Sequence, residues 1–236
     1  MKKFLLATTL FYLGLSQTGK AQEISFDAEL SALRKKIVVM CAQLQAGQPR
    51  ESHNQLLGEV DWVIGQWSAL TNKYKDNPPA EYSKDPEWKN YFSEASDNFF
   101  IMRQKIENKD YKRAMQFCGM NCALFVKIHQ INGKITLTDL MFTVRQHLKM
   151  AISMAKAGNW RDAKKNMNDT RKLIRVIVKL PVPTGIEKQK YLADVDLLKK
   201  SYSQLNEVFS KEKTDQLNQQ FKKFMGIFNA IYSKYL

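Results

Sequence analysis

The stretch FCGMNCALFVK at residues 117–127 recurs as FMGIFNAIYSK at residues 224–234, at an offset of 107. Phenylalanine, glycine, alanine and lysine hold the same places in both stretches, and aliphatic or aromatic residues share several others. A second pair, QAGQPRE at 45–51 and KAGNWRD at 156–162, is offset by 111. A repeat of this length is a whole small domain rather than one unit of a solenoid. The sequence therefore predicts an internal duplication.

Both copies consist of segments whose apolar residues lie three to four positions apart, the spacing of one helix face. In the first segment these residues are Leu30, Leu33, Ile37, Met40 and Leu44. Further segments cover residues 56–67, 88–106, 111–128, 140–155, 163–177, 192–205 and 217–231. Short turns between helices make consecutive helices antiparallel neighbours. We therefore expect an all-α chain of two tandem up-down four-helix bundles, residues 22–133 and residues 134–236.

The first residues are typical of a secretory signal peptide. Met1-Lys2-Lys3 supplies a positive start, residues 4–15 are apolar, and Gly19-Lys20-Ala21 offers small residues for cleavage. The apolar run is shorter than the roughly 20 residues that span a bilayer. We expect residues 1–21 to be removed, leaving an exported chain without a transmembrane span. The short lysine-rich start indicates a bacterial protein that is periplasmic or secreted.

Positive charge is concentrated in the second copy. Residues 22–133 contain 14 basic and 14 acidic residues, whereas residues 134–236 contain 20 and 9, a net charge of +11. Seven of the cations recur at helical spacing along about 27 Å of one expected helix: Arg161, Lys164, Lys165, Arg171, Lys172, Arg175 and Lys179. This pattern predicts an anionic partner, such as an acidic lipid, a polysaccharide or an acidic protein. Sequence-specific nucleic-acid binding is not expected, because no recognition motif accompanies the charge. The alternative is an ordinary solvated helix face with lysine in excess.

The three cysteines are candidates for a disulfide. Cys118 and Cys122 lie four residues apart on one expected helix, and Cys41 lies on the first helix of the same bundle. The first and fourth helices of an up-down bundle are antiparallel neighbours, which places Cys41 near the level of Cys118. An oxidising compartment allows a disulfide between Cys41 and Cys118. A bridge between Cys118 and Cys122 is not expected, because residues four apart on a helix hold their Cβ atoms about 5–6 Å apart, too far for a disulfide. Free thiols packed as small core residues are one alternative, and a metal or cofactor role is another.

A four-helix bundle with paired cysteines on its last helix resembles cytochrome c prime. In that family a Cys-x-x-Cys-His motif on the fourth helix attaches haem, and its histidine binds the iron. Here Cys118 and Cys122 are one residue further apart, and Ala123 stands in place of the histidine. In the second copy Met225 and Asn229 replace the two cysteines. The resemblance thus implies a duplicated cytochrome-like bundle with a degraded haem-attachment motif. We expect this bundle to bind no cofactor; the alternative is that it binds haem.

One helix face offers candidate metal ligands. His147, Met150 and Met154 lie at positions i, i+3 and i+7 and therefore share a face. Imidazole and thioether groups suit copper, so these residues form a candidate copper site. The alternative is a helical core rich in methionine with a partly exposed histidine beside it.

Sequence patterns of common catalytic sites are missing. The chain contains no Gly-x-Ser-x-Gly, no His-Glu-x-x-His and no phosphate-binding glycine loop. We therefore expect an exported, non-enzymatic binding protein whose basic second half contacts an anionic partner. The rival hypothesis is a periplasmic haem protein for electron transfer or gas binding. A monomer and a homodimer are both compatible with the sequence.

Overall fold

The computed structural model describes residues 25–45, 52–183, 185–212 and 214–235, which form eight α-helices and contain no strand. The helices are α1 (Phe26–Gln45), α2 (His53–Tyr74), α3 (Trp88–Glu107), α4 (Tyr111–Ile131), α5 (Leu137–Lys156), α6 (Trp160–Lys179), α7 (Lys188–Ser210) and α8 (Thr214–Tyr235). A short 3-10 helix, η1 (Ala80–Tyr82), lies between α2 and α3. The all-α prediction is confirmed. The predicted signal segment, residues 1–21, and most of the stretch 45–51 lie outside the described residues.

Polar side chains determine where several helices begin. Ser52 accepts a hydrogen bond from the backbone N–H of Gln55, and the Gln55 side chain accepts one from the backbone N–H of Ser52. Thr136 and Asp139 form the same reciprocal capping box at the start of α5. Such boxes satisfy backbone donors that the first turn of a helix leaves without partners. Gly158 follows α5 at φ +79°, a left-handed conformation that glycine adopts without steric cost.

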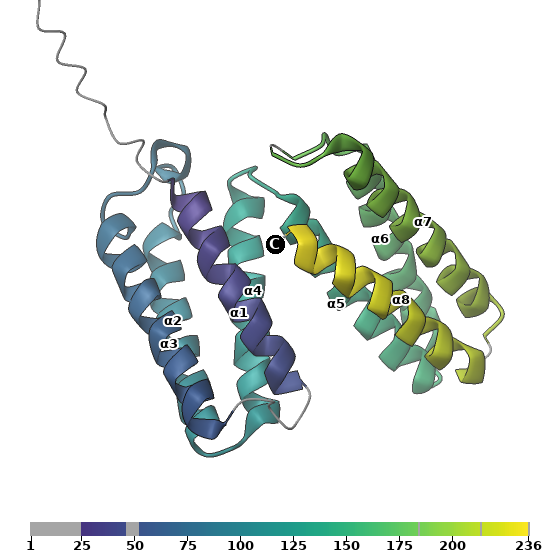
Figure 1. The fold of residues 1–236 in the computed structure, drawn as a ribbon, viewed down its shortest axis with the longest axis horizontal. Helices are drawn as coiled ribbons and strands as arrows, with labels where there is room; N and C mark the ends of the chain where they lie inside the picture. The colour runs from purple at the N-terminus through teal and green to yellow at the C-terminus, as the bar shows by residue number, and fades with distance from the viewer. Residues whose placement is uncertain (1–24, 46–51, 184, 213, 236) are drawn as a thin grey trace, which may run out of the picture.

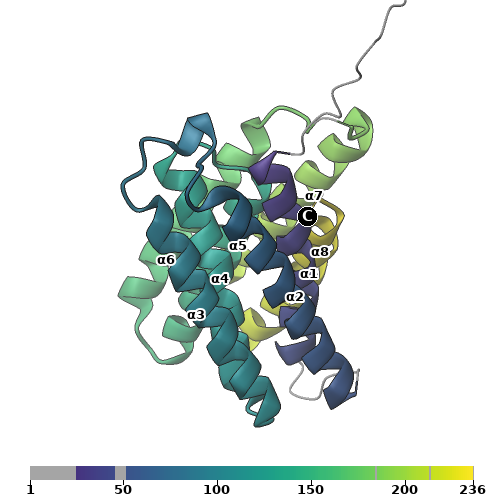
Figure 2. The same ribbon diagram turned by 90° about the vertical axis from the view of Figure 1, so that its left-hand side faces the viewer.

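The helices form two four-helix bundles that lie side by side (Figure 1). In the first bundle α1 and α3 each pack against α2 and α4, and in the second α5 and α7 each pack against α6 and α8. The bundles are close together at the α4–α5 turn and diverge away from it, with α1 and α4 on the side of α5 and α8 (Figure 1). Figure 2 shows the first bundle in front of the second.

Aromatic side chains fill the interior of both bundles. Trp67 is 2% exposed, and its ring stacks on Phe92 with 5.1 Å between centroids. Its indole N–H donates to the hydroxyl of Ser96 at 3.1 Å, so burial leaves no unsatisfied donor. In the second bundle Tyr202 lies edge-on to the fully buried Phe224, with 6.3 Å between centroids. Aromatic residues of both bundles therefore contribute to one hydrophobic cluster that runs through the molecule.

The predicted apolar stripes are mostly buried, and α7 shows where one prediction is wrong. All five predicted core residues of α1 are at most 2% exposed. In α7 we expected Leu192 in the core, but this side chain is 50% exposed. Its neighbour Tyr191, at 1%, is buried instead and lies edge-on to Tyr235 of α8 at 5.6 Å. Adjacent residues of a helix point about 100° apart, and the packing of α7 against α8 turns Tyr191 rather than Leu192 toward the core.

Candidate functional site

The predicted cationic residues all lie exposed on one face of α6. We call this set the α6 basic surface: Arg161, Lys164, Lys165, Arg171, Lys172, Arg175 and Lys179. The opposite face of the helix packs into the bundle through Ala163, Met167, Thr170, Ile174 and Ile177. The helix begins at Asn159, whose side chain accepts a hydrogen bond from the backbone N–H of Asp162. Packing of one face thus holds the cations of the other in a row, and their partner stays a prediction.

Carboxylates neutralise only part of the α6 basic surface. Lys164 pairs with Glu212 at 2.6 Å, and Lys172 pairs with Asp169 at 2.8 Å. The hydrogen bond from Lys172 lowers the pKa of the Asp169 carboxyl. In the part of the chain that the structure describes, five of the seven cations form no ion pair: Arg161, Lys165, Arg171, Arg175 and Lys179. The surface therefore keeps a positive charge that a ligand can use.

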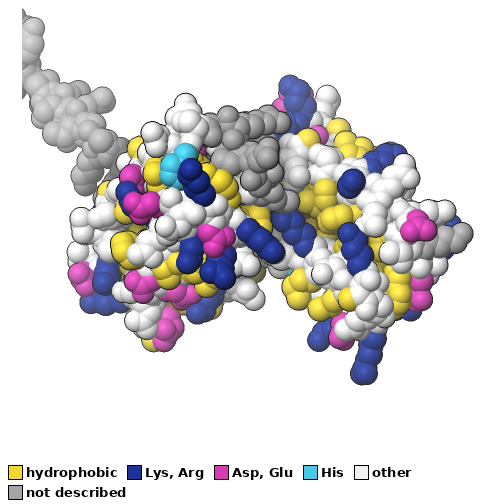
Figure 3. Space-filling model, turned by 90° about the horizontal axis from the view of Figure 1, so that it is seen from below, with side chains coloured by type: hydrophobic (Ala, Val, Ile, Leu, Met, Phe, Trp, Pro, Cys, Tyr) yellow, Lys and Arg dark blue, Asp and Glu magenta, His cyan; other side chains and the backbone are white. Residues whose placement is uncertain are grey.

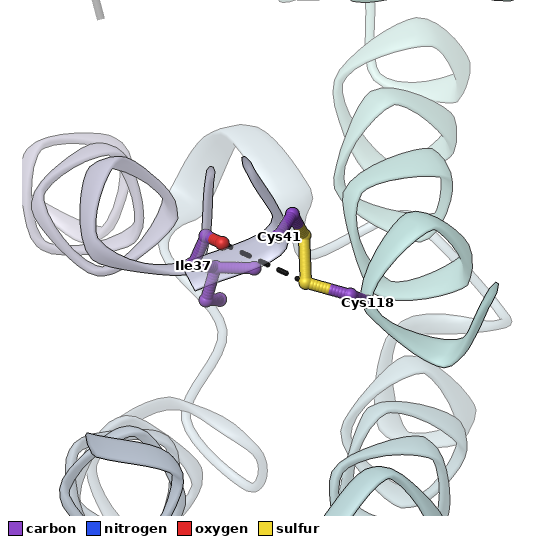
Figure 4. The surroundings of a disulfide bond; sticks show 3 residues. All are labelled: Ile37, Cys41 and Cys118. Atoms are coloured by element: carbon purple, nitrogen blue, oxygen red, sulfur yellow. Dashed lines mark hydrogen bonds between the residues drawn. A yellow bond between two sulfur atoms is a disulfide. The ribbon is translucent and has the colours of Figure 1, made fainter. Parts of the chain in front are cut away.

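Cys41 of α1 and Cys118 of α4 form a disulfide (Figure 4). Their Cα atoms lie 5.9 Å apart, as in ordinary bridges. Of the alternatives that the sequence left open for the cysteines, the structure contains the disulfide. Sγ of Cys118 lies 3.6 Å from the carbonyl oxygen of Ile37 (Figure 4), a packing contact, because a disulfide sulfur carries no proton. Cys122 is a buried thiol whose pKa is raised by burial, against the opposing effect of two nearby arginines.

The residues of the first bundle do not fit haem. Cys118 is held in the disulfide and is not available for a thioether bond. Ala123 provides no axial ligand, and His129 of α4 is buried with its Nδ1 2.7 Å from Oδ2 of Asp139. Aromatic rings around Trp67 occupy the interior of the bundle. One cysteine and the histidine of the haem-attachment motif are thus not available on α4, and the resemblance to cytochrome c prime stays a prediction.

Asn166 of α6 binds two of the three candidate copper ligands. Its Oδ1 accepts a hydrogen bond from Nδ1 of His147 at 3.0 Å, and its Nδ2 donates to Sδ of Met154 at 3.4 Å. Met150 is 47% exposed. The described residues contain no group of three or more His, Cys, Asp or Glu that could hold a metal ion. Copper binding at this face stays a prediction; the contact with Asn166 uses Nδ1 of His147 and leaves Nε2 as the nitrogen that could bind a metal.

A buried polar cluster that we did not predict joins the two bundles. Arg34 of α1 forms an ion pair with Asp139 of α5, and these residues are 3% and 0% exposed. The other oxygen of Asp139 accepts a hydrogen bond from His129 of α4. Nε2 of His129 lies 3.8 Å from Oδ1 of Asp27, which accepts a hydrogen bond from the hydroxyl of Tyr82 at 2.5 Å. The cluster therefore connects α1 and α4 of one bundle to the first turn of α5 in the other.

The partners of Asp139 keep its carboxyl ionised. Burial acts to raise its pKa, but the hydrogen bond from His129 and the charge of Arg34 outweigh burial, so the pKa is lowered. The sequence signals only one role of this residue, the capping box with Thr136 three positions earlier. Arg34 lies 105 positions away, and no local pattern indicates that contact.

Comparison of the chain with models of protein families, with curated proteins and with solved structures finds no match in any of the three. No helix in the described ranges is long and apolar enough to cross a membrane. What the protein does must therefore be argued from its own residues.

Proposed function

We propose that this chain is an exported, non-enzymatic binding protein that attaches to an anionic lipid surface through the α6 basic surface. The observation that supports this proposal is the set of five exposed cations on one helix face that lack carboxylate partners. A straight row of charges about 27 Å long contacts several head groups of a lipid layer at once. Val176 and Val178, exposed at 46% and 37%, lie on either side of the row and add apolar contact.

The expected strength of attachment follows from the number of unpaired cations. Each Lys or Arg near an anionic membrane surface contributes about 1 kcal/mol, so five contribute about 5 kcal/mol. That free energy corresponds to a change of about three to four orders of magnitude in binding. The attraction is screened over about 8 Å at physiological ionic strength, so binding should weaken as salt is added.

Cosedimentation of the chain with lipid vesicles tests the proposal. We expect binding to phosphatidylglycerol vesicles at low salt, loss of binding at high salt, and none to phosphatidylcholine vesicles. The variant Lys165→Gln/Arg175→Gln/Lys179→Gln should bind much more weakly. The control variant Lys35→Gln/Lys84→Gln removes exposed lysines of the first bundle and should bind normally.

Three results would overturn the proposal: no binding to the vesicles at low salt, binding that does not depend on salt, or an equal loss of vesicle binding in the two variants. Binding to an anionic polysaccharide or to polyglutamate in preference to phosphatidylglycerol would assign a different partner to the α6 basic surface.

The rival haem hypothesis has a direct test. A visible spectrum of the protein purified from the periplasm of haem-sufficient cells should show no Soret band, because Cys118 is bonded and His129 is bound to Asp139. A stoichiometric Soret band would favour the rival. Export is tested in the same preparation, whose N-terminal residue should be Gln22.

A further inference from the structure

A cleft of about 800 Å³ lies between the two bundles, a volume typical of ligand sites. Helices α1 and α4 form one wall, and α5 and α8 form the other. Figure 3 views the molecule from the side on which the bundles diverge and shows Lys and Arg side chains next to apolar ones. The apolar lining includes Val38, Met115, Phe142, Phe221 and Met225.

Among the described residues that line the cleft, every charged side chain is cationic. Arg145 and Lys149 extend from α5, Lys222 extends from α8, and none of these described lining residues carries a carboxylate. Burial, and then the charge of Arg145, lowers the pKa of Lys149. In the described parts of the chain, Nε of Arg145 and the hydroxyl of Tyr232 are buried and have no hydrogen-bond partner. Buried donors without an acceptor are unfavourable, so these groups favour a ligand with an anionic oxygen.

Arg145 has the position in the second bundle that Arg34 has in the first, but it lacks a carboxylate partner among the described residues. The offset of 111 residues that relates the two glycine-containing turns also relates Arg34 to Arg145. Both guanidinium groups lie over the ring of Phe142, at 5.7 and 5.4 Å from its centroid. Arg34 has the carboxylate of Asp139 as its partner. Within the described ranges Arg145 forms no ion pair, so the acid present at one arginine is missing at the other.

We propose that the cleft binds a fatty acid, with its carboxylate beside Arg145 and its hydrocarbon chain on the apolar lining. The ligand carboxylate takes the role that Asp139 has beside Arg34. Lys149 and Lys222 add positive charge to the same site. This site is distinct from the α6 basic surface and does not rest on the function proposed for that surface.

Isothermal titration calorimetry with dodecanoate, below its micelle concentration, tests the ligand class. We expect one molecule per chain with a Kd of order 10 μM. Dodecyltrimethylammonium has the same tail with the opposite charge and should not bind, and acetate lacks the tail and should not bind. No binding of dodecanoate, or equal binding of the cationic detergent, would overturn the proposal.

Matched variants locate the binding in the cleft. Gly226 lines the cleft and a Cβ added there has open space around it, so we expect Gly226→Phe to place its ring in the cleft and to abolish binding. Gly65→Phe is equally unhindered on α2, outside the cleft, and should bind normally. Arg145→Met should weaken binding about tenfold, whereas Lys223→Gln should not, because Lys223 is not part of the lining.

The two phenylalanine variants should keep the melting temperature of the parent, which separates a blocked cleft from a lost fold. Unchanged dodecanoate affinity in the folded Gly226→Phe or Arg145→Met variant would overturn the assignment. The triple variant of the α6 basic surface should bind dodecanoate normally, so failure of one proposal is distinguishable from failure of the other.

Discussion

Replacing Asp139 by asparagine tests how strongly the buried polar cluster holds the two bundles together. The change keeps the shape of the side chain but removes the negative charge between Arg34 and His129, which are 3% and 5% exposed. Removing one partner of a buried ion pair leaves a charge without compensation, which costs about 3–5 kcal/mol. Because the free energy of unfolding decreases by about 3 kcal/mol for each 1 M of urea, the urea concentration at the midpoint of unfolding should fall by about 1–2 M.

A double-mutant cycle separates the ion pair from the packing around it. Arg34→Met together with Asp139→Asn leaves neither partner of the ion pair charged. The free energy of unfolding lost in the double variant should therefore be smaller, by about 1–3 kcal/mol, than the sum of the losses in the two single variants. The control is Asp61→Asn, because Asp61 pairs with Arg103 at the exposed surface and should shift the midpoint little. A midpoint for Asp139→Asn within about 0.2 M of the parent, or a strictly additive cycle, would refute the reasoning.

The lowered pKa of Asp139 gives the same cluster a pH dependence. A carboxyl with a lower pKa in the folded than in the unfolded chain stabilises the fold fully above its unfolded pKa, about 3.9. That contribution is lost as the pH falls through the folded pKa. We therefore expect the urea midpoint to fall below about pH 4, and less steeply in the Asp139→Asn variant. Equal acid dependence in the two proteins would contradict this assignment.

Further predictions concern the cores. Replacing Cys41 and Cys118 by alanine removes a cross-link between positions 77 residues apart and should cost about 4 kcal/mol in urea unfolding; a loss below about 1 kcal/mol would contradict it. Asn121→Leu should stabilise by about 1–2 kcal/mol, because both polar atoms of this buried amide lack partners, and a lower melting temperature would show otherwise. Tyr191→Ala should cost about 3 kcal/mol and Leu192→Ala less than about 0.5 kcal/mol in the same assay, and the reverse order would place Leu192 in the core.

Helical periodicity predicted the cores well where apolar and polar residues alternate clearly. In the first half of α1, Ser31 and the charged residues 34–36 separate the apolar residues Leu30, Leu33 and Ile37, and these three apolar residues are buried. At Tyr191 and Leu192 two apolar residues are adjacent, so the pattern permits two rotations of the helix. The choice between them depends on packing against Tyr235 of α8, which a single helix does not encode.

Contacts across the molecule were predictable only when chain topology fixed them. The up-down order of one bundle was enough to bring Cys41 to the level of Cys118. The placement of one bundle against the other has no such local signal. No local pattern distinguishes Arg34 and Arg145 from other helix-face cations, although one is buried in an ion pair and the other lines the cleft. The cations of α6 were recognisable because their spacing within one helix is sufficient to place them.

The predicted duplication makes Arg34 and Arg145 equivalent residues, and both guanidinium groups lie over the ring of Phe142 where the two bundles meet. In a symmetric homodimer equivalent residues have identical surroundings, so any acid that neutralises one arginine also neutralises the other. Joining both halves in one polypeptide lifts that constraint. Of the two arginines, only Arg34 pairs with Asp139, so one arginine joins the two bundles while its equivalent keeps a charge that no carboxylate of the described residues neutralises.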